Sequence, residues 1–281
     1  MRVFSGKEYV KDYIEGLKER AARIKQSIGR EPELSIVLVG NDPSSLSYIR
    51  KNADVCKRAG VNVRLIELDE ATTTSEIRSC INRLNSENDV DGILVQMPLP
   101  AHVRSNEVVQ AIAPDKDVDG VTEHSAAMLY LGAGDPFLPN TPMGVMSIIR
   151  SEGIETKGKR AVVLGRSNIV GKPMAMMLMK ADATVTICHS KTENIREVCK
   201  EADILVCAIG KAHFVSEDMV KEGTAVFDIG TNYVNGKLTG DVDFEKVAPK
   251  TSFITPVPNG CGPVTVCMLI ENTLRAAEKK V

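Results

Sequence analysis

Short apolar segments alternate with amphipathic segments along the chain, and this alternation limits the fold more than any other feature of the sequence. Apolar runs at residues 34–39 (LSIVLV) and 90–95 (VDGILV) come before or after stretches with helical spacing, such as residues 45–59 and 74–85. Strands joined through helices pair in parallel and are covered by helices on both faces. The sequence therefore predicts an α/β protein with parallel sheets, whose ligands bind at the carboxyl ends of the strands.

The alternation occurs in two series, separated by a stretch rich in glycine and proline, and this predicts two α/β domains. A length of 281 residues suits two ordinary domains. We expect residues 1–120 and a C-terminal helix at 265–281 to form a catalytic domain. Residues 140–264 are expected to form a Rossmann-type dinucleotide-binding domain, with residues 121–139 as a linker.

Composition excludes several classes of protein. The formal net charge of -2 lacks the basic surplus of a nucleic-acid binder. The seven cysteines include no CxxC pair, so we expect reduced core thiols, a cytoplasmic location and no metal site. The N-terminus has no apolar leader, and no run approaches the ~18 apolar residues of a membrane span.

A glycine-bearing turn at residues 165–171 (GRSNIVG) lies between a predicted strand and a predicted helix. Glycine there lets the backbone approach a pyrophosphate, whose charge the helix N-terminus stabilises. The usual G-x-G-x-x-G fingerprint has one residue fewer between its outer glycines, and here Ser167 stands near the middle glycine position. The motif alone therefore also fits a turn that binds nothing.

The end of the next predicted strand favours NADP over NAD. An NAD site usually places a carboxylate there, about 20 residues after the glycine turn, to bind the ribose 2′-hydroxyl. Here the strand at 184–188 ends in His189, Ser190 and Lys191. These side chains and Arg166 suit a 2′-phosphate, although an ordinary solvated basic rim gives the same pattern.

Beyond these local patterns, the chain resembles the bifunctional methylenetetrahydrofolate dehydrogenase/cyclohydrolase family (FolD-like) from about residue 7 to residue 277. The resemblance is carried by collinear motifs: VGNDPSSLSYI, DGILVQMPLP, PDKDVDG, NTPMGV, VVLGRSNIVGKPM, TVTICHSKT and ITPVPNGCGPVTVCMLIENT. It implies a folate-binding domain and an NADP-binding domain with an active-site cleft between them, and a homodimer.

The implied reaction is the NADP-dependent oxidation of 5,10-methylenetetrahydrofolate to 5,10-methenyltetrahydrofolate, a step of one-carbon metabolism that serves purine biosynthesis. Hydride leaves a carbon that bridges two nitrogens, and those nitrogens stabilise the cation. The protein therefore mainly has to align donor and acceptor, and this step needs no general base.

The resemblance also assigns site residues. The expected catalytic residues are Tyr48, Asn52, Gln96 and Asp119. The expected substrate-binding residues are Ser45, Tyr48, Gln96, Pro98, Leu99, Asp119, Gly260, Gly262, Pro263 and Thr265. The expected cofactor-binding residues are Thr141, Gly165, Arg166, Ser167, Ile169, Val170, Gly171, His189, Ser190, Lys191, Ala208, Ile209, Gly210, Asp228, Gly230 and Thr231. Plain turn chemistry is the alternative for Asp119 and for the strand-end glycines.

The chain departs from the family pattern four residues after Tyr48, where the family has a lysine credited with the cyclohydrolase step and this chain has Asn52. Asparagine has no titratable amine, so we expect that step to be weak or absent. Lys51 is adjacent, but one residue turns a side chain by about 100° around a helix. Asn140 stands where the family commonly has a cysteine, and Asn259 stands where it commonly has a glycine. A glycine at that position suggests a positive φ, which asparagine tolerates.

Four alternatives remain at this stage. The chain could be the full bifunctional enzyme, with Lys51 or another group in place of the family lysine. It could be a Rossmann dehydrogenase of another small substrate, which the motifs around Tyr48, Gln96 and Asp119 argue against. It could be a non-catalytic folate- or nucleotide-binding homologue, which the intact glycine turn argues against. An interaction protein without a small-molecule site is the least supported.

Overall fold

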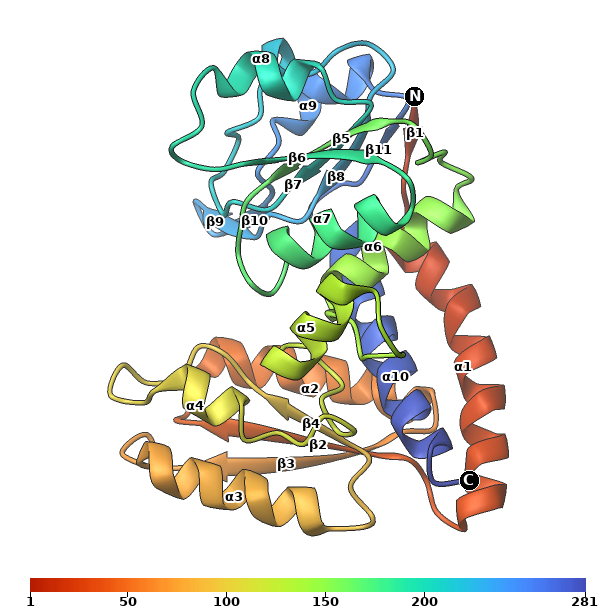
Figure 1. Cartoon of the computed structure of the whole chain (residues 1–281), viewed down its shortest axis with the longest axis vertical. Helices are drawn as coiled ribbons and strands as arrows, with labels where there is room; N and C mark the ends of the chain where they lie inside the picture. Colours follow the sequence, from red (N-terminus) through yellow and green to blue (C-terminus); the bar gives the residue numbers. More distant parts are fainter. The chain divides into compact units, whose positions relative to one another are not determined.

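The computed structural model describes residues 1–42, 46, 49, 50 and 52–281. It divides into two compact units, which Figure 1 shows coloured along the chain. Unit 1 comprises residues 1–10 and 139–265, and unit 2 comprises residues 11–138 and 266–281. No helix among the described residues is long and apolar enough to cross a membrane.

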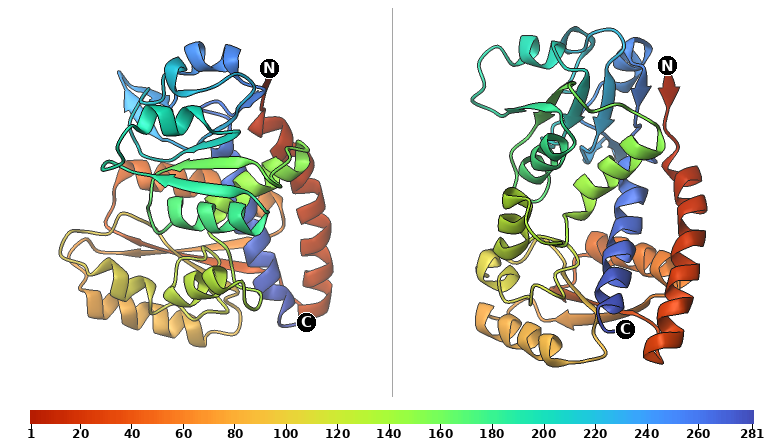
Figure 2. Two further views of the ribbon diagram at one scale, coloured as in Figure 1. Left: turned by 45° about the horizontal axis from the view of Figure 1, so that its top comes forward. Right: turned by 45° about the vertical axis from the view of Figure 1, so that its right-hand side comes forward.

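Unit 1 contains a six-stranded sheet in the order β1-β11-β8-β7-β5-β6, in which all neighbours are parallel. Its elements are β1 (Arg2–Val3), α6 (Asn140–Ser151), β5 (Arg160–Leu164), α7 (Gly171–Lys180), β6 (Thr184–Cys188), α8 (Ile195–Lys200), β7 (Ile204–Cys207), β8 (Ala225–Asp228), β9 (Asn232–Val234), β10 (Lys237–Thr239), α9 (Phe244–Val247) and β11 (Phe253–Ile254). Single 3₁₀ turns lie at Glu217–Met219 and Ala248–Lys250. Helices α6 and α7 lie on one side of this sheet, and α8 and α9 on the other (Figures 1 and 2).

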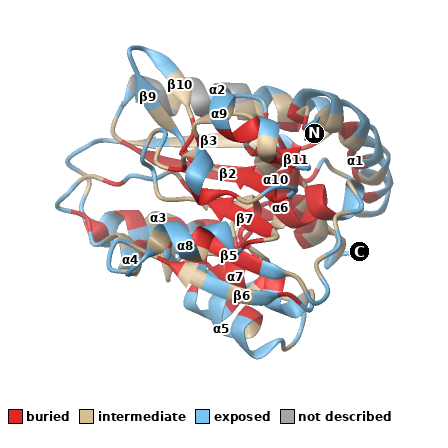
Figure 3. Cartoon of the chain, turned by 90° about the horizontal axis from the view of Figure 1, so that it is seen from above, coloured by how far each residue is buried: buried red, intermediate tan, exposed pale blue. Residues whose placement is uncertain are grey.

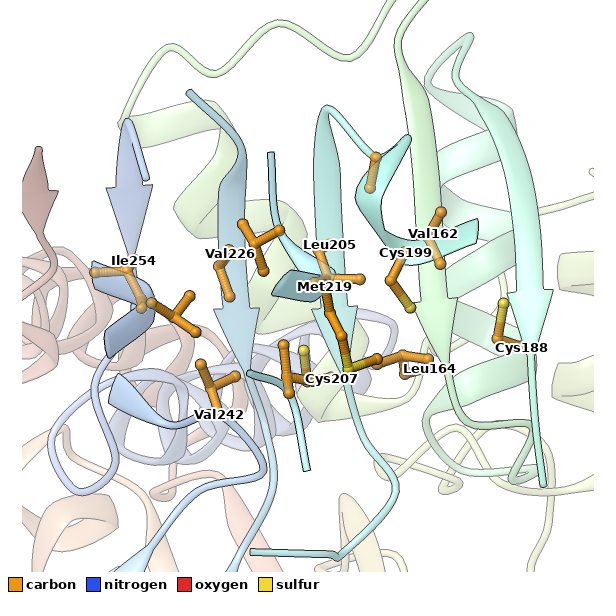
Figure 4. Close-up of a cluster of buried hydrophobic side chains, with 14 of the residues drawn as sticks. Val162, Leu164, Cys188, Cys199, Leu205, Cys207, Met219, Val226, Val242 and Ile254 are labelled. Atoms are coloured by element: carbon orange, nitrogen blue, oxygen red, sulfur yellow. The ribbon is translucent and has the colours of Figure 1, made fainter. Parts of the chain in front are cut away.

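The inner strands of the unit 1 sheet are short apolar runs that are buried on both faces, as a parallel sheet requires. Strands β5, β7 and β8 have almost no exposed residue, whereas β6 at the edge alternates. Figure 3 shows β7 coloured as buried. Val162, Leu164, Leu205, Val226 and Ile254 contribute to a core cluster under α8 and α9 (Figure 4). This core fixes the carboxyl ends of the strands at one edge.

Unit 2 contains a three-stranded parallel sheet in the order β3-β2-β4. Its elements are α1 (Gly6–Ile28, which begins in unit 1), β2 (Glu33–Val39), α2 (Pro43–Arg58), β3 (Asn62–Leu68), α3 (Thr74–Ser86), β4 (Gly92–Val95), α4 (Ser105–Val109), α5 (Glu123–Leu131) and α10 (Cys261–Glu278, which ends in unit 2). Ile77, Ile81 and Leu84 of α3 pack with Ile93 of β4 and Val108 of α4 in one apolar cluster. A capping box of Thr73 and Glu76 begins α3.

The predicted fold class, α/β with two domains and a Rossmann-type domain in the C-terminal half, is confirmed. The bounds of the compact units differ from the expected domains at two places. Residues 2–3 pair with β11 of unit 1, because a short N-terminal strand extends that sheet. Residues 121–138, expected as a linker, belong to unit 2 and include α5.

Candidate functional site: a nucleotide pocket in unit 1

A pocket of about 390 Å³ lies where β5, β6 and β7 end. It is lined by Leu164, Gly165, Arg166, Cys188, His189, Ser190, Thr192, Ile195, Ala208, Ile209, Lys211 and Phe214. After β5 the chain adds β6 on one side and β7 on the other, so the sheet order reverses at β5. The crevice at such a reversal is where open α/β sheets bind ligands, and its size suits a small molecule or part of a cofactor.

Gly165 begins the turn after β5 and is tightly enclosed. Its φ is +121°, and a Cβ at this position would lie 2.3 Å from the carbonyl oxygen of Ala208. A Cβ on Gly171, the other outer glycine, would lie 2.2 Å from the carbonyl oxygen of Gly165. Both glycines are therefore required by the packing of the turn against β7 and against the start of α7.

Ser167 closes the same turn. Its Oγ accepts hydrogen bonds from the backbone N–H groups of Val170 and Gly171, at 3.2 and 3.3 Å. The side chain is exposed, and its hydroxyl hydrogen can still be donated. The turn thus presents an O–H donor beside the N-terminus of α7, as a phosphate site requires.

Two cationic side chains, Arg166 and Lys211, line the pocket, and Lys191 directly follows the lining residue Ser190 in the chain. Arg166, Lys191 and Lys211 are exposed, and none of the three forms an ion pair with any described residue. The Nζ of Lys211 lies 5.8 Å from the centroid of the Phe214 ring, which also lines the pocket. The end of β6 carries His189 and Ser190 rather than a carboxylate, so this edge suits an anionic group.

The pocket brings together six of the residues expected at a cofactor site. They are Gly165, Arg166, His189, Ser190, Ala208 and Ile209. The remaining expected residues are not among its lining: Thr141, Ser167, Ile169, Val170, Gly171, Lys191, Gly210, Asp228, Gly230 and Thr231. Residues 167–171 belong to the same glycine turn, so their place in the site stays a prediction.

Asp228 and Gly230 have contacts of another kind. Asp228 is 3% exposed, and its carboxylate accepts backbone hydrogen bonds from Gly230, Asp241 and Val242, each at 3.0 Å. A Cβ on Gly230 would lie 2.2 Å from the Cγ of Asp241. A neighbouring carboxylate accounts for this glycine without any ligand. At Gly210, by contrast, a Cβ would meet no neighbouring atom, so only the positive φ of +65° favours glycine.

The expected folate residues of unit 2 lie after β4 and in α2. Gln96 follows β4 and is half-buried, with its Nε2 donating to the carbonyl oxygen of Met97 at 2.8 Å. Pro98 is exposed and Leu99 is buried. Asn52 in α2 is half-buried. Ser45, Tyr48 and Lys51 lie outside the described residues.

Two aspartates of the DVDG stretch differ in their surroundings. The buried carboxylate of Asp117 accepts hydrogen bonds from the hydroxyls of Thr122 and Ser125, at 2.7 and 2.6 Å. These contacts begin α5 and account for Asp117 as a structural residue. Asp119, the residue expected to bind the pterin, is half-buried instead. Its assignment to the pterin therefore rests on the resemblance.

The start of α10 and the start of α6 are joined within unit 1. The Oγ1 of Thr265 donates to the Oγ1 of Thr141 at 3.3 Å. The preceding turn has Asn259 at a φ of +71°, so the positive φ expected at this position is confirmed. Asn140 is buried at the first position of α6. Among the other expected residues, Gly260 is buried, Gly262 exposed and Pro263 half-buried.

Residue patterns alone missed part of the lining: Leu164, Cys188, Thr192, Ile195, Lys211 and Phe214. Lys211 had a signal, because a lysine directly after a strand-end glycine lies at the ligand-binding edge of a parallel sheet. Ile195 and Phe214 had none, because they reach the pocket only through the folding of the loops after β6 and β7. No group of three or more metal-binding side chains occurs within the part of the chain that the structure describes.

Comparisons with known protein families match both parts of the chain. A model described as the tetrahydrofolate dehydrogenase/cyclohydrolase NAD(P)-binding domain matches residues 139–281. A model of the catalytic domain of the same enzymes matches residues 4–119. The bifunctional protein FolD of Campylobacter curvus is 48% identical over 281 residues, which is 100% of this chain and 97% of the relative.

Solved structures agree. The FolD methylenetetrahydrofolate dehydrogenase/cyclohydrolase of Campylobacter jejuni has a TM-score of 0.98 at 42% identity, and the match covers 100% of both chains. The dehydrogenase-cyclohydrolase of Trypanosoma brucei, solved with an NADP cofactor and an inhibitor, has a TM-score of 0.94 at 35% identity. That match covers 99% of this chain and 97% of the other.

Proposed function

The chain belongs to the tetrahydrofolate dehydrogenase/cyclohydrolase family, and on this premise we propose that it oxidises 5,10-methylenetetrahydrofolate to the 5,10-methenyl form with NADP⁺. The observation that carries the proposal is the pocket at the ends of β5, β6 and β7, with a glycine turn and exposed, unpaired cations. When bound, NADP⁺ supplies the hydride acceptor. The protein supplies binding and alignment, which is what this reaction requires.

Arg166, Ser190 and Lys191 support NADP as the nucleotide. A ribose 2′-phosphate is a dianion, and guanidinium, hydroxyl and ammonium groups all donate to it. Because no acid within the described residues pairs with Arg166 or Lys191, binding a phosphate breaks no ion pair of theirs. We propose that these three side chains set the preference for NADP over NAD.

The folate is assigned to residues of unit 2 on the strength of the family. Gln96 and Asp119 offer an amide and a carboxylate that suit the 2-amino group and ring nitrogens of a pterin. Of the two aspartates in this stretch, Asp117 is buried and begins α5, and Asp119 is the one that the resemblance assigns to the pterin. We assign Tyr48 to contact with the folate ring, as the resemblance implies. A cytoplasmic homodimer is part of the same proposal.

The test is a reduction assay with purified protein, 5,10-methylenetetrahydrofolate and NADP⁺, in which methenyl and NADPH absorbances are followed separately. We expect both to rise together, with NAD⁺ much poorer than NADP⁺. Absence of reduction with both nucleotides would favour a non-catalytic folate- or nucleotide-binding homologue. Equal rates with NAD⁺ and NADP⁺ would remove the assigned role of Arg166, Ser190 and Lys191.

We further propose that the second activity of the family, hydrolysis of the methenyl product to 10-formyltetrahydrofolate, is weak or absent in this chain. Asn52 lies four residues after Tyr48 in the helix α2. The resemblance implies that members of the family carry a lysine at this position. An amide can orient water but cannot carry a proton at neutral pH. Relatives named bifunctional favour the alternative, in which Lys51 or another group performs this step.

The Asn52→Lys variant distinguishes these two readings. In the wild type we expect methenyl-tetrahydrofolate to decay at the rate of the enzyme-free blank. In Asn52→Lys we expect decay at least about 100-fold faster, the lower end of the range for general acid–base catalysis. Fast decay in the wild type that is lost in Lys51→Met would assign the step to Lys51 instead.

A further inference from the structure

Asp241 is buried behind the nucleotide pocket and holds one of its walls. Its side chain is on the segment that follows β10, and the residue is 0% exposed. One carboxylate oxygen accepts from the backbone N–H groups of Ile209 and Gly210, at 2.7 and 3.1 Å, and the other accepts from Lys211 at 2.7 Å. Three successive N–H groups of the turn after β7 thus converge on one carboxylate.

The same carboxylate joins this turn to a second loop. The Oδ1 of Asp241 also accepts from the side-chain amide of Asn232, the first residue of β9, at 3.0 Å. The backbone N–H of Asp241 is in turn held by Asp228 at 3.0 Å. Glycines make this arrangement possible, because a Cβ on Gly240 would lie 1.8 Å from an oxygen of Asp228.

The contacts of Asp241 require an acceptor with two equivalent oxygens. All four of its partners are neutral N–H donors, and no described residue forms an ion pair with it. A carboxylate can accept from all of them, and its charge strengthens each bond. An asparagine would keep one oxygen and turn an NH₂ group toward N–H donors, so part of the set would be lost.

We propose that Asp241 is a positioning residue for the nucleotide, which sets the conformation of the turn at residues 209–211 without touching the ligand. Ile209 and Lys211 line the pocket, whereas Asp241 does not. A fixed turn binds more tightly because the cost of ordering it has been met during folding. The inference rests on the proposed function only in that the nucleotide is NADP(H).

The experiment is a direct titration of the full-length protein with NADPH, followed by nucleotide fluorescence, in the wild type and three variants. We expect Asp241→Asn to bind NADPH about 10- to 100-fold more weakly, the effect of losing one charge-assisted hydrogen bond. Asn232→Ala removes the fourth donor and leaves the turn bonds intact, so we expect its Kd within about threefold of wild type. Asp243→Asn makes the same chemical change at a carboxylate outside the pocket lining and should bind like the wild type.

The outcomes separate the two proposals. A wild type that does not bind NADPH overturns the proposed function. A wild type that binds, with Asp241→Asn equally tight, overturns the positioning role alone. If Asp241→Asn weakens binding no more than Asn232→Ala, the effect is general loss of structure and the positioning role is also overturned.

A second measurement covers the case in which Asp241→Asn does not fold. Amide hydrogen exchange of the wild type reports directly on the N–H groups of Ile209, Gly210 and Lys211. Because all three donate to Asp241, we expect them to exchange slowly although Gly210 and Lys211 are exposed. Exchange as fast as that of a solvent-exposed turn would contradict the proposed role.

Discussion

Replacing Gly165 with alanine should damage both the stability of unit 1 and its affinity for NADPH. The residue has a φ of +121°, and a new Cβ would lie 2.3 Å from the carbonyl oxygen of Ala208. Backbone strain of this kind costs about 1–3 kcal/mol. Forcing a methyl group into filled space costs roughly another 1–3 kcal/mol. We therefore expect the free energy of unfolding to fall by about 2–6 kcal/mol.

The change should also reach the pocket, because Gly165 and Ala208 both line it and the clash can be relieved only by moving one from the other. Gly158→Ala is a matched control, since Gly158 has a φ of +72° but an open Cβ position. Positive φ alone should cost Gly158→Ala about 1–2 kcal/mol. We expect urea unfolding to separate the two variants and NADPH titration to show weaker binding, by at least about tenfold, in Gly165→Ala only.

The close approach of Gly165 to β7 would be refuted by a Gly165→Ala protein as stable as Gly158→Ala and with the NADPH affinity of the wild type. A Gly165→Ala protein that binds NADPH weakly but is as stable as the wild type would have a different meaning. The turn would then have moved without cost to the fold, into a conformation that no longer fits the nucleotide.

Two further predictions concern charged groups. Arg166→Gln should weaken NADP⁺ binding by about 10- to 100-fold, which is the effect of losing one charge-assisted hydrogen bond. In parallel titrations, NAD⁺ binding should be nearly unchanged. Equal weakening of NADP⁺ and NAD⁺ binding would contradict a contact between Arg166 and the 2′-phosphate. Asp91→Ala should lower the free energy of unfolding in urea by about 2–3 kcal/mol, with exposed Asp89→Ala as a control that changes little. This is below the roughly 3–5 kcal/mol for breaking a fully buried pair, because the partners of Asp91, Arg30 and Lys280, keep side-chain exposures of 28% and 32%.

The core elements of the fold follow from sequence because each is specified locally. The predicted strands at residues 34–39 and 184–188 agree with β2 and β6, where short strand-forming runs are bounded by turns. β1 is two residues long and pairs with β11, about 250 positions away in the chain, so no local pattern reveals it. β9 and β10 have three residues each and are largely exposed, which removes the apolar signal of a strand.

The site divides in a similar way. Gly165 and the residues after β6 could be placed at the pocket from sequence, because a close backbone approach demands glycine and the strand ends of a parallel sheet lie at its ligand-binding edge. Asp241 could not, because its partners are main-chain N–H groups, which every sequence has and which only the tertiary fold brings together. In sequence, Gly240-Asp241 has the composition of an ordinary turn. Buried carboxylates that hold a ligand-binding loop are therefore a class of functional residue that requires a structure.

The buried carboxylate of Asp228 gives a pH dependence whose sign can be derived. Burial raises its pKa from 3.8 to about 7, and the charge of Asp241 adds to this, although three backbone hydrogen bonds act in the opposite direction. The thiols of Cys207 and Cys261 lie near it, and burial raises the pKa of each, so both stay neutral below pH 8. Of Asp228, Cys207 and Cys261, Asp228 is therefore the group whose pKa is raised into the neutral range.

Because the folded state of Asp228 holds its proton more tightly than the unfolded state, its contribution to stability is full below pH 3.8 and is lost as the pH rises to about 7. The loss is at most about 4 kcal/mol, from roughly 1.4 kcal/mol for each pKa unit. Asp91 acts in the other direction. Burial would raise the pKa of Asp91, but hydrogen bonds from Arg30 and Lys280 outweigh burial and lower that pKa. The contribution of Asp91 to stability is therefore lost only as the pH falls below its ordinary pKa. Urea midpoints between pH 5 and 8 should therefore fall more steeply in the wild type than in Asp228→Asn, whose amide does not titrate. The two proteins differ only at this position, so equal slopes would show that Asp228 keeps its charge throughout this range.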